Sequence, residues 1–171
     1  TQFSTLVDVG GGDGALLSSI LAATPGLHGT LFDTGPGLAE SSERLRAAGV
    51  EDRCDVVEGD FFDAVPAGAD AYIMKSVIHD WDDEKCVTIL SNCRRAMNAG
   101  GKVLILEPVV PPAVKPSFAL LGVMMSDLNM LLNTGGKERT EDGFASILSA
   151  AGLALTGIHR APKPSTMSVI E

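Results

Sequence analysis

Positive charge is scarce in this chain of 171 residues. Its 13 lysines and arginines stand against 22 aspartates and glutamates, which gives a formal net charge of -9. A surface with this balance repels phosphate backbones, and no stretch of the sequence gathers enough basic residues to offset the repulsion locally. We therefore expect no nucleic-acid partner.

Long apolar runs and paired cysteines are also missing. No stretch approaches the roughly 18 apolar residues that cross a bilayer, and the first residues lack the basic and apolar regions of a signal peptide. Cysteine occurs only at Cys54, Cys86 and Cys93. The last two are separated by about 10 Å of rise on a predicted helix, which is beyond disulfide reach. These absences predict reduced thiols, no membrane partner and a soluble cytoplasmic protein.

The order of the remaining segments predicts an α/β fold. Short runs rich in β-branched residues alternate with segments of helical spacing, a pattern that favours a mainly parallel sheet covered by helices. We predict a last helix capped by Thr140 and ended by Gly152. The other predicted helices are 14–24, 38–48, 83–97 and 117–133. The predicted strands are 5–9, 28–33, 53–58, 69–75, 102–107, 153–159 and 166–170. We interpret 1–171 as one domain.

The sequence LVDVGGGDGALLSSIL predicts a strand, a tight glycine turn and a helix. Gly10, Gly12 and Gly14 would let the backbone approach a ligand, and the helix would present unpaired N–H groups to an anion. The turn also satisfies the dinucleotide fingerprint G-x-G-x-x-G/A, with Asp33 about 20 residues further on. From these residues alone, the turn indicates a nucleotide-like cofactor, with a purely structural turn as the alternative.

Two acidic residues at further strand ends extend this candidate site. Asp33 could accept hydrogen bonds from both hydroxyls of a ribose, or it could cap the following helix. Asp60, in EGDFF, could accept from an adenine amino group while Phe61 or Phe62 packs on the ring. For Phe62, ordinary core packing is the simpler interpretation.

His79 stands where an apolar strand changes into an acidic segment, in MKSVIHDWDDEKC. An imidazole with an ordinary pKa of about 6.5 could act as a general base. Without context, a lone histidine at a strand end is more often structural. The neighbouring acids Asp82, Asp83 and Glu84 could form a magnesium site with it. A helix N-terminus matched to its dipole explains them more simply, and we predict no metal.

The segment SFALLGVMMSDLNMLLN, residues 117–133, is unusually rich in methionine. Methionine side chains adapt to flat aromatic ligands, so this predicted helix could line a pocket for one. Plain core packing and a partner interface are the alternatives.

Taken together, six motifs resemble those of the S-adenosylmethionine-dependent O-methyltransferases. In chain order they are the glycine turn, LFD, GDFF, MKSVIHDWDDEKC, GGKVLILEPVVP and LLNTGGKERTEDGF. The resemblance is to the metal-independent caffeic acid and small-phenol type, including its bacterial secondary-metabolite members. It implies a Rossmann-like class I methyltransferase fold, a doubly wound seven-stranded sheet that is mostly parallel with an antiparallel last strand. It also implies methyl transfer from S-adenosylmethionine to a hydroxyl of a small phenolic acceptor, with S-adenosylhomocysteine as product.

The resemblance assigns roles to individual residues. His79 would be the catalytic base, flanked by Glu107 of LILEP and Glu138 of GGKER. Met130 and Asn133 would contact the acceptor. The residues expected to bind the cofactor are Asp8, Gly10, Gly12, Asp33, Asp60, Phe61 and Lys75.

The same family implies an organisation beyond this chain. Its members carry a helical dimerisation domain before the catalytic domain, which we expect this chain to lack, and we expect the full-length protein to be a homodimer. Two alternatives to methyl transfer remain open. The chain could bind the cofactor without catalysis as an isolated fragment, or it could be an NAD-dependent oxidoreductase, as the glycine fingerprint alone would suggest.

Overall fold

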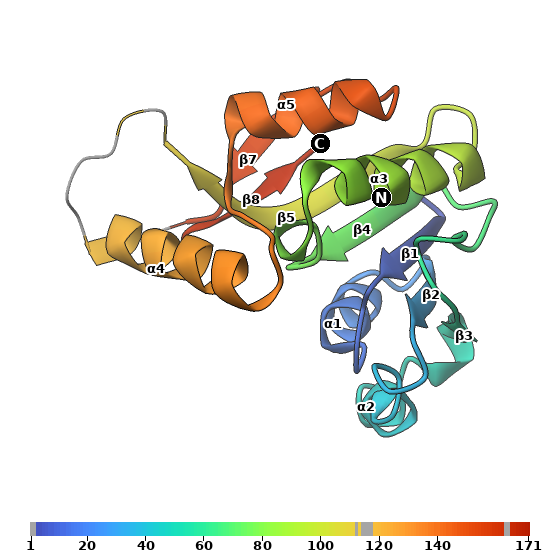
Figure 1. Cartoon of the computed structure of the whole chain (residues 1–171). Coiled ribbons are helices and arrows are strands. Elements are labelled where there is room, and N and C mark those ends of the chain that lie inside the picture. The colour runs from blue at the N-terminus through green and yellow to red at the C-terminus, as the bar shows by residue number, and fades with distance from the viewer. Residues whose placement is uncertain (1–2, 112, 114–117, 163–164) are drawn as a thin grey trace. The chain divides into compact units, whose positions relative to one another are not determined.

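The computed structural model describes residues 3–111, 113, 118–162 and 165–171, and the side chains of 118 and 119 lie outside this description. The chain forms two compact units, and Figure 1 labels the helices and strands that belong to them. The first unit comprises residues 3–74 and Asn92–Val103. The second comprises Lys75–Ser91 and Leu104–Glu171.

The first unit is built on parallel strands in the order β3-β2-β1-β4. They are β1 (Thr5–Val9), β2 (His28–Asp33), β3 (Cys54–Glu58) and β4 (Ala71–Lys75). Helix α1 (Ala15–Ala23) packs against β2 and against α2 (Ser41–Ala47), and a short 3-10 turn, η1 (Glu51–Arg53), precedes β3. The apolar residues of β1 and β4 are buried, as expected for parallel strands covered on both faces, whereas β3 is mostly exposed.

The second unit contains most of β5 (Lys102–Val110), together with β6 (Arg139–Thr140), β7 (Ile158–Arg160) and β8 (Met167–Ile170). Strand β8 lies between β5 and β7 and is antiparallel to both, while β6 pairs with β5 in parallel. The helical elements are η2 (Ile78–Asp80), the first part of α3 (Asp83–Ala96), α4 (Phe118–Asn133) and α5 (Glu141–Ala150). The predicted α/β sheet with an antiparallel last strand is thus confirmed.

Most element boundaries agree with the prediction within three residues; one strand differs by more, and one reaches that limit. The predicted strand 153–159 is wrong over its first half, because β7 begins only at Ile158. Its partner β8 is four residues long, so a longer edge strand would have no ladder to join. Strand β5 extends beyond the predicted residue 107 to Val110, because Val109 and Val110 pair with β6, which we did not predict. Thr140 caps α5 as predicted, accepting the Gly143 N–H.

The structure also bears on two features of the sequence, its apolar runs and its cysteines. Among the described residues, no helix combines the length and the apolar character needed to cross a membrane. Cys54, Cys86 and Cys93 are all free thiols.

Candidate active site

The glycine turn lies in the first unit, directly after β1. Parallel strands end at the same edge of their sheet, so the turn, the end of β2 and the end of β3 lie close together. Gly12 has a φ of 58°, and a Cβ built at this position would meet no atom of the described residues within 4 Å. The backbone at Gly12 is therefore bare and accessible, as a closely approached ligand requires.

Asp33 links the three strand ends. Its Oδ2 accepts the Gly12 N–H at 2.8 Å, and its Oδ1 accepts the Thr34 N–H at 2.7 Å. Its carbonyl oxygen accepts the Gly59 N–H at 3.0 Å. Asp33 does not cap α2, which begins eight residues later at Ser41. Oδ1 also accepts the Thr34 hydroxyl at 3.2 Å, so the lone pair that remains for a ligand hydroxyl is on Oδ2.

The GDFF motif forms a fixed turn after β3. Asp60 Oδ1 accepts the Phe62 N–H at 2.8 Å, and the rings of Phe61 and Phe62 meet edge to face at 4.9 Å. The Asn92 amide donates to the carbonyls of both phenylalanines. The two rings are half-buried, so a ligand could still reach them.

Gly11, in the glycine turn after β1, packs closely against Asp8. Asp8 is buried, and a Cβ at Gly11 would overlap Leu31 and lie 2.8 Å from the Asp8 carboxyl carbon. Gly11 is therefore needed for close packing on Asp8, a requirement that our sequence analysis missed. The run of three consecutive glycines was the available signal.

His79 lies in the second unit, in the turn η2 after β4. The backbone enters this turn through Ser76, whose φ of 56° is rare for a residue other than glycine and indicates local strain. The His79 side chain is 14% exposed, and its Nδ1 lies 3.1 Å from Oε1 of Glu138, whose side chain is fully buried. On the other side of the ring, Nε2 lies 3.8 Å from Asp80 Oδ1.

Glu107 and Glu138 hold His79 in different ways. Glu107, on β5, accepts the main-chain N–H groups of Val77 (3.1 Å) and His79 (3.0 Å) through a single oxygen, Oε1. Glu138 instead contacts the ring. Both glutamates predicted from the resemblance thus lie beside His79, one supporting its backbone and the other its imidazole.

These surroundings set the protonation of the three groups. The hydrogen bond to Glu138 raises the pKa of His79, against an opposing contribution from burial. Burial raises the pKa of Glu107 to about 7. Burial would also raise the pKa of Glu138, but hydrogen bonds from His79 and Ser126 outweigh it and lower that pKa. Glu138 is therefore the ionised partner of the histidine.

Residues 136–139 fasten the turn that carries His79. The Lys137 N–H donates to the His79 carbonyl at 2.9 Å. The Arg139 side chain, 2% exposed, donates to the carbonyls of Ile78 (3.0 Å) and Trp81 (2.8 Å) and to the Asp83 carboxylate. A Cβ at Gly136 would overlap the His79 carbonyl oxygen. The sequence pattern GGKER indicated Glu138, but not these roles of Gly136 and Arg139.

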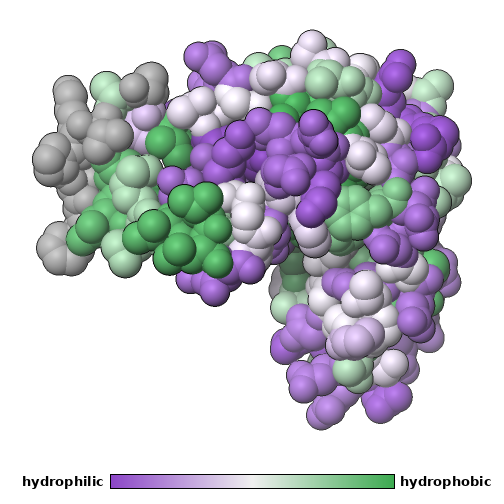
Figure 2. Space-filling model, in the orientation of Figure 1, coloured by the Kyte–Doolittle hydropathy of each residue, from purple (hydrophilic) through white to green (hydrophobic). Residues whose placement is uncertain are grey.

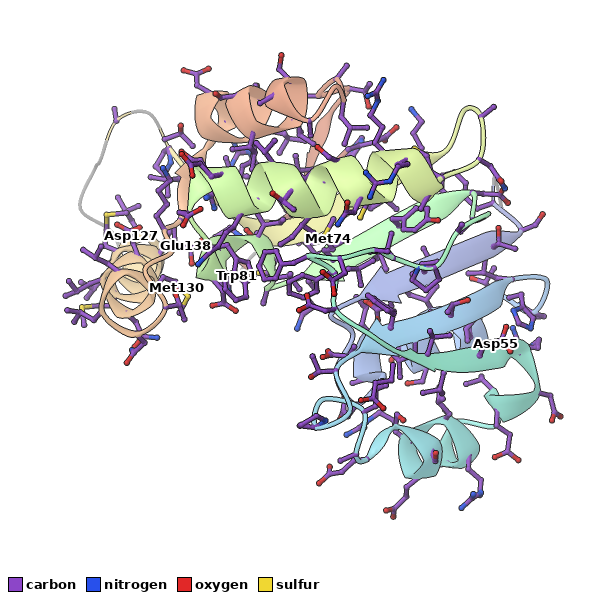
Figure 3. All side chains as sticks on the ribbon, turned by 45° about the vertical axis from the view of Figure 1, so that its right-hand side comes forward. Asp55, Met74, Trp81, Asp127, Met130 and Glu138 are labelled. Carbon is purple, nitrogen blue, oxygen red and sulfur yellow. The ribbon has the colours of Figure 1, made fainter. Side chains whose placement is uncertain are left out.

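Helix α4 reaches the same glutamate. Ser126 donates to Glu138 Oε1 at 2.7 Å, and Asp127 Oδ1 accepts the Glu138 N–H at 2.8 Å. Figure 3 shows Asp127, Met130 and Glu138 gathered at this end of the unit. The predicted acceptor residues Met130 and Asn133 lie on this helix, half-buried and exposed respectively. Sequence reasoning missed Ser126 and Asp127, since no spacing rule relates them to Glu138.

Much of α4 is apolar and exposed. Figure 2 shows hydrophobic side chains gathered over this helix. The exposed ones are Leu121, Met125, Leu128, Leu131 and Leu132. Plain core packing therefore does not account for the methionine-rich segment.

The remaining predicted residue, Lys75, is exposed at the end of β4. It belongs to the second unit with His79, Glu107, Glu138, Met130 and Asn133, whereas the other predicted cofactor residues belong to the first. Within the described part of the chain, no group of three His, Cys, Asp or Glu side chains is arranged to hold a metal ion.

Comparison with known proteins identifies relatives of this chain. Residues 1–154 match the family model described as O-methyltransferase domain. Phenazine O-methyltransferase PhzM of Lysobacter antibioticus is 45% identical over 171 residues, covering 100% of this chain and 48% of that protein. O-demethylpuromycin-O-methyltransferase of Streptomyces alboniger is 42% identical over 171 residues, covering 100% of this chain and 45% of that protein.

A solved O-methyltransferase structure is also similar to this chain. The O-methyltransferase NcsB1 from neocarzinostatin biosynthesis, in complex with S-adenosylmethionine and 2-hydroxy-5-methyl naphthoic acid, superposes with a TM-score of 0.86 at 38% identity. The match covers 98% of this chain and 47% of that one. The chain thus spans about half the length of the relatives it matches.

Proposed function

Because this chain belongs to the O-methyltransferase domain family, we propose that it forms the cofactor-binding and catalytic part of an enzyme that methylates a hydroxyl of a small aromatic molecule. The methyl donor is S-adenosylmethionine, which relatives such as NcsB1 bind. Phenolic secondary metabolites are the expected acceptors, because the relatives act on phenazine, puromycin and naphthoate compounds.

The observation that supports this proposal most directly is the pair formed by His79 and Glu138. With a proton on Nδ1, the imidazole donates to Glu138 and keeps the lone pair of Nε2 free to act as a base. His79 Nε2 would take the proton of the acceptor hydroxyl as the hydroxyl oxygen bonds to the methyl carbon, and the electron pair of the broken carbon–sulfur bond would stay on sulfur, which leaves S-adenosylhomocysteine. Glu138 stabilises the imidazolium that results, in the way a triad carboxylate does.

The residues of the first unit are suited to the cofactor. S-adenosylmethionine supplies a methyl group already activated by its sulfonium, so in-line placement and removal of a proton suffice for transfer. The bare backbone at Gly12 admits a close ligand, and the second lone pair of Asp33 Oδ2 can accept a ribose hydroxyl. Asp60, Phe61 and the buried Asp8 complete the proposed cofactor contacts within this unit.

Replacement of His79 tests the catalytic part of the proposal. In the full-length protein, His79→Ala should reduce methyl transfer by at least a hundredfold while cofactor affinity, measured by calorimetry, stays nearly unchanged. The matched control is His159→Ala, because the His159 side chain is 68% exposed and lies on the short strand β7. Equal turnover of the two variants on a phenol panel would exclude His79 as the base.

Ligand binding separates the alternatives. Thermal shift measurements with S-adenosylhomocysteine and with NAD should show stabilisation by the former only. Stabilisation by NAD alone would support an oxidoreductase. Tight binding of S-adenosylhomocysteine without transfer to any phenol would support a cofactor-binding fragment.

We extend the proposal to the location of the enzyme and to its partners. It acts in the cytoplasm on a small molecule and not on nucleic acid, as the excess of acidic residues favours. The full-length protein forms a homodimer through a helical domain outside this chain. Light scattering of the full-length protein, compared with this chain alone, tests that assembly.

A further inference from the structure

Two donors share one oxygen of Glu138. His79 Nδ1 lies 3.1 Å from Oε1, and the Ser126 hydroxyl donates to the same atom at 2.7 Å. Within the described part of the chain, the buried Oε2 has no hydrogen-bond partner. The hydrogen bonds of this carboxylate are therefore concentrated on Oε1, whose negative charge the serine and the histidine share.

Ser126 is well placed to hold this arrangement. It follows Met124 and Met125 on α4, and the next residue, Asp127, accepts the Glu138 N–H at 2.8 Å. Helix α4 is thus attached to Glu138 at both its main chain and its carboxylate. The attachment to the carboxylate depends on the Ser126 hydroxyl alone. A substitution of Ser126 can remove it and leave the main-chain attachment through Asp127 in place.

We propose that Ser126 is a positioning residue for the catalytic base, acting through Glu138 to limit how strongly the carboxylate retains a proton on His79. The inference rests on the proposed function, in which neutral His79 is the working form. Each hydrogen bond to a carboxylate disperses its negative charge. Without the serine, the charge of Oε1 would act on the imidazolium alone, and His79 would stay protonated up to a higher pH.

The other groups around His79 do not replace this effect. Glu107 faces it from β5, Asp80 from its own turn and Glu138 from the 136–139 segment, and all three favour the protonated ring. Arg139 acts on Glu138 from the same segment. Ser126 is the hydroxyl that α4 directs at Glu138 Oε1.

A matched pair of variants isolates the hydroxyl. Threonine and valine have the same shape, so Ser126→Thr keeps the donor and Ser126→Val removes it. Imidazole NMR titration of the full-length protein reads His79 directly, because the chain contains only 3 histidines and His79→Gln identifies its signal. This measurement does not require turnover.

The expected result is a His79 titration midpoint that is higher in Ser126→Val than in wild type and unchanged in Ser126→Thr. For methyl transfer, kcat/KM of Ser126→Val should fall by roughly three- to tenfold on the acid side of the profile and recover at alkaline pH. A midpoint that is unchanged or lower in Ser126→Val would overturn the inference. Absence of methyl transfer in wild type would reject the proposed function, and the NMR result would still decide the role of Ser126.

Discussion

Glu107 binds the backbone of His79 and not its ring: one carboxylate oxygen accepts the His79 N–H at 3.0 Å, within a site where burial raises the pKa of Glu107 to about 7. The two glutamates that flank the histidine therefore have separate tasks. Glu107 fixes where the residue lies, and Glu138 contacts the imidazole itself.

The raised pKa of Glu107 predicts a pH-dependent gain from Glu107→Gln. Glutamine keeps the oxygen that accepts the Val77 and His79 N–H groups but never ionises. The folded pKa of about 7 lies above the ordinary value of 4.5, so between these values the folded state binds more protons and stability falls as pH rises. We expect the variant to exceed wild type by about 1–3 kcal/mol above pH 7 and to match it near pH 4.5.

Urea denaturation at alkaline and acidic pH measures this difference. Glu43→Gln on the exposed surface of α2 is the control, and should track wild type at both pH values. A Glu107→Gln variant that is less stable than wild type at alkaline pH would show that the ionised carboxylate stabilises the fold.

Arg139 should contribute strongly to stability. Arg139→Met leaves the carbonyls of Ile78 and Trp81 without the guanidinium that they now accept from, which should cost about 2–4 kcal/mol in unfolding free energy. Arg139→Lys should recover part of this, because one ammonium cannot span both carbonyls and Asp83. Arg46→Met, which removes only an exposed pair with Glu51, should cost less than about 1 kcal/mol. Equal effects at positions 139 and 46 would contradict the assignment.

Alanine substitutions at Gly136 and Gly122 should have opposite effects, one harmful to activity and one favourable to stability. In Gly136→Ala the new methyl group would overlap the His79 carbonyl oxygen, so the turn must move, and we expect at least a tenfold loss of kcat/KM. In Gly122→Ala, on α4, the methyl group meets no described atom within 4 Å and should stabilise the helix by about 0.5–1 kcal/mol. Steady-state kinetics with a denaturation curve for each variant tests both expectations. Full activity of Gly136→Ala would show that the turn tolerates displacement.

Gly12 provides the test of the cofactor site. Its φ of 58° disfavours a side chain, and a methyl group would occupy the bare surface of the turn. Gly12→Ala should weaken S-adenosylhomocysteine binding by tenfold or more in calorimetry. Gly26→Ala, where a Cβ also meets nothing within 4 Å in the part of the chain that the structure describes, should leave the affinity unchanged. Equal affinities would remove Gly12 from the proposed contacts.

The sequence predicted the elements better than the contacts between them. Strands such as 28–33 and helices such as 83–97 carry their own periodicity and capping signals, and the structure places them within a residue. The strand at 153–159 was overpredicted because its extent is set by its partner β8, not by its own residues. Glu107 and Glu138 were identified by family resemblance, whereas Ser126 and Arg139 act through side-chain geometry that no spacing rule encodes.

The fastening of the His79 turn has a practical consequence for protein engineering. The bonds from Lys137 and Arg139 end on the carbonyl oxygens of Ile78, His79 and Trp81, which every amino acid possesses. The attachment of the turn therefore does not depend on which side chains residues 78 to 81 carry. Libraries at 136 and 139, by contrast, should consist mostly of inactive clones, because those positions supply the contacts from the other side.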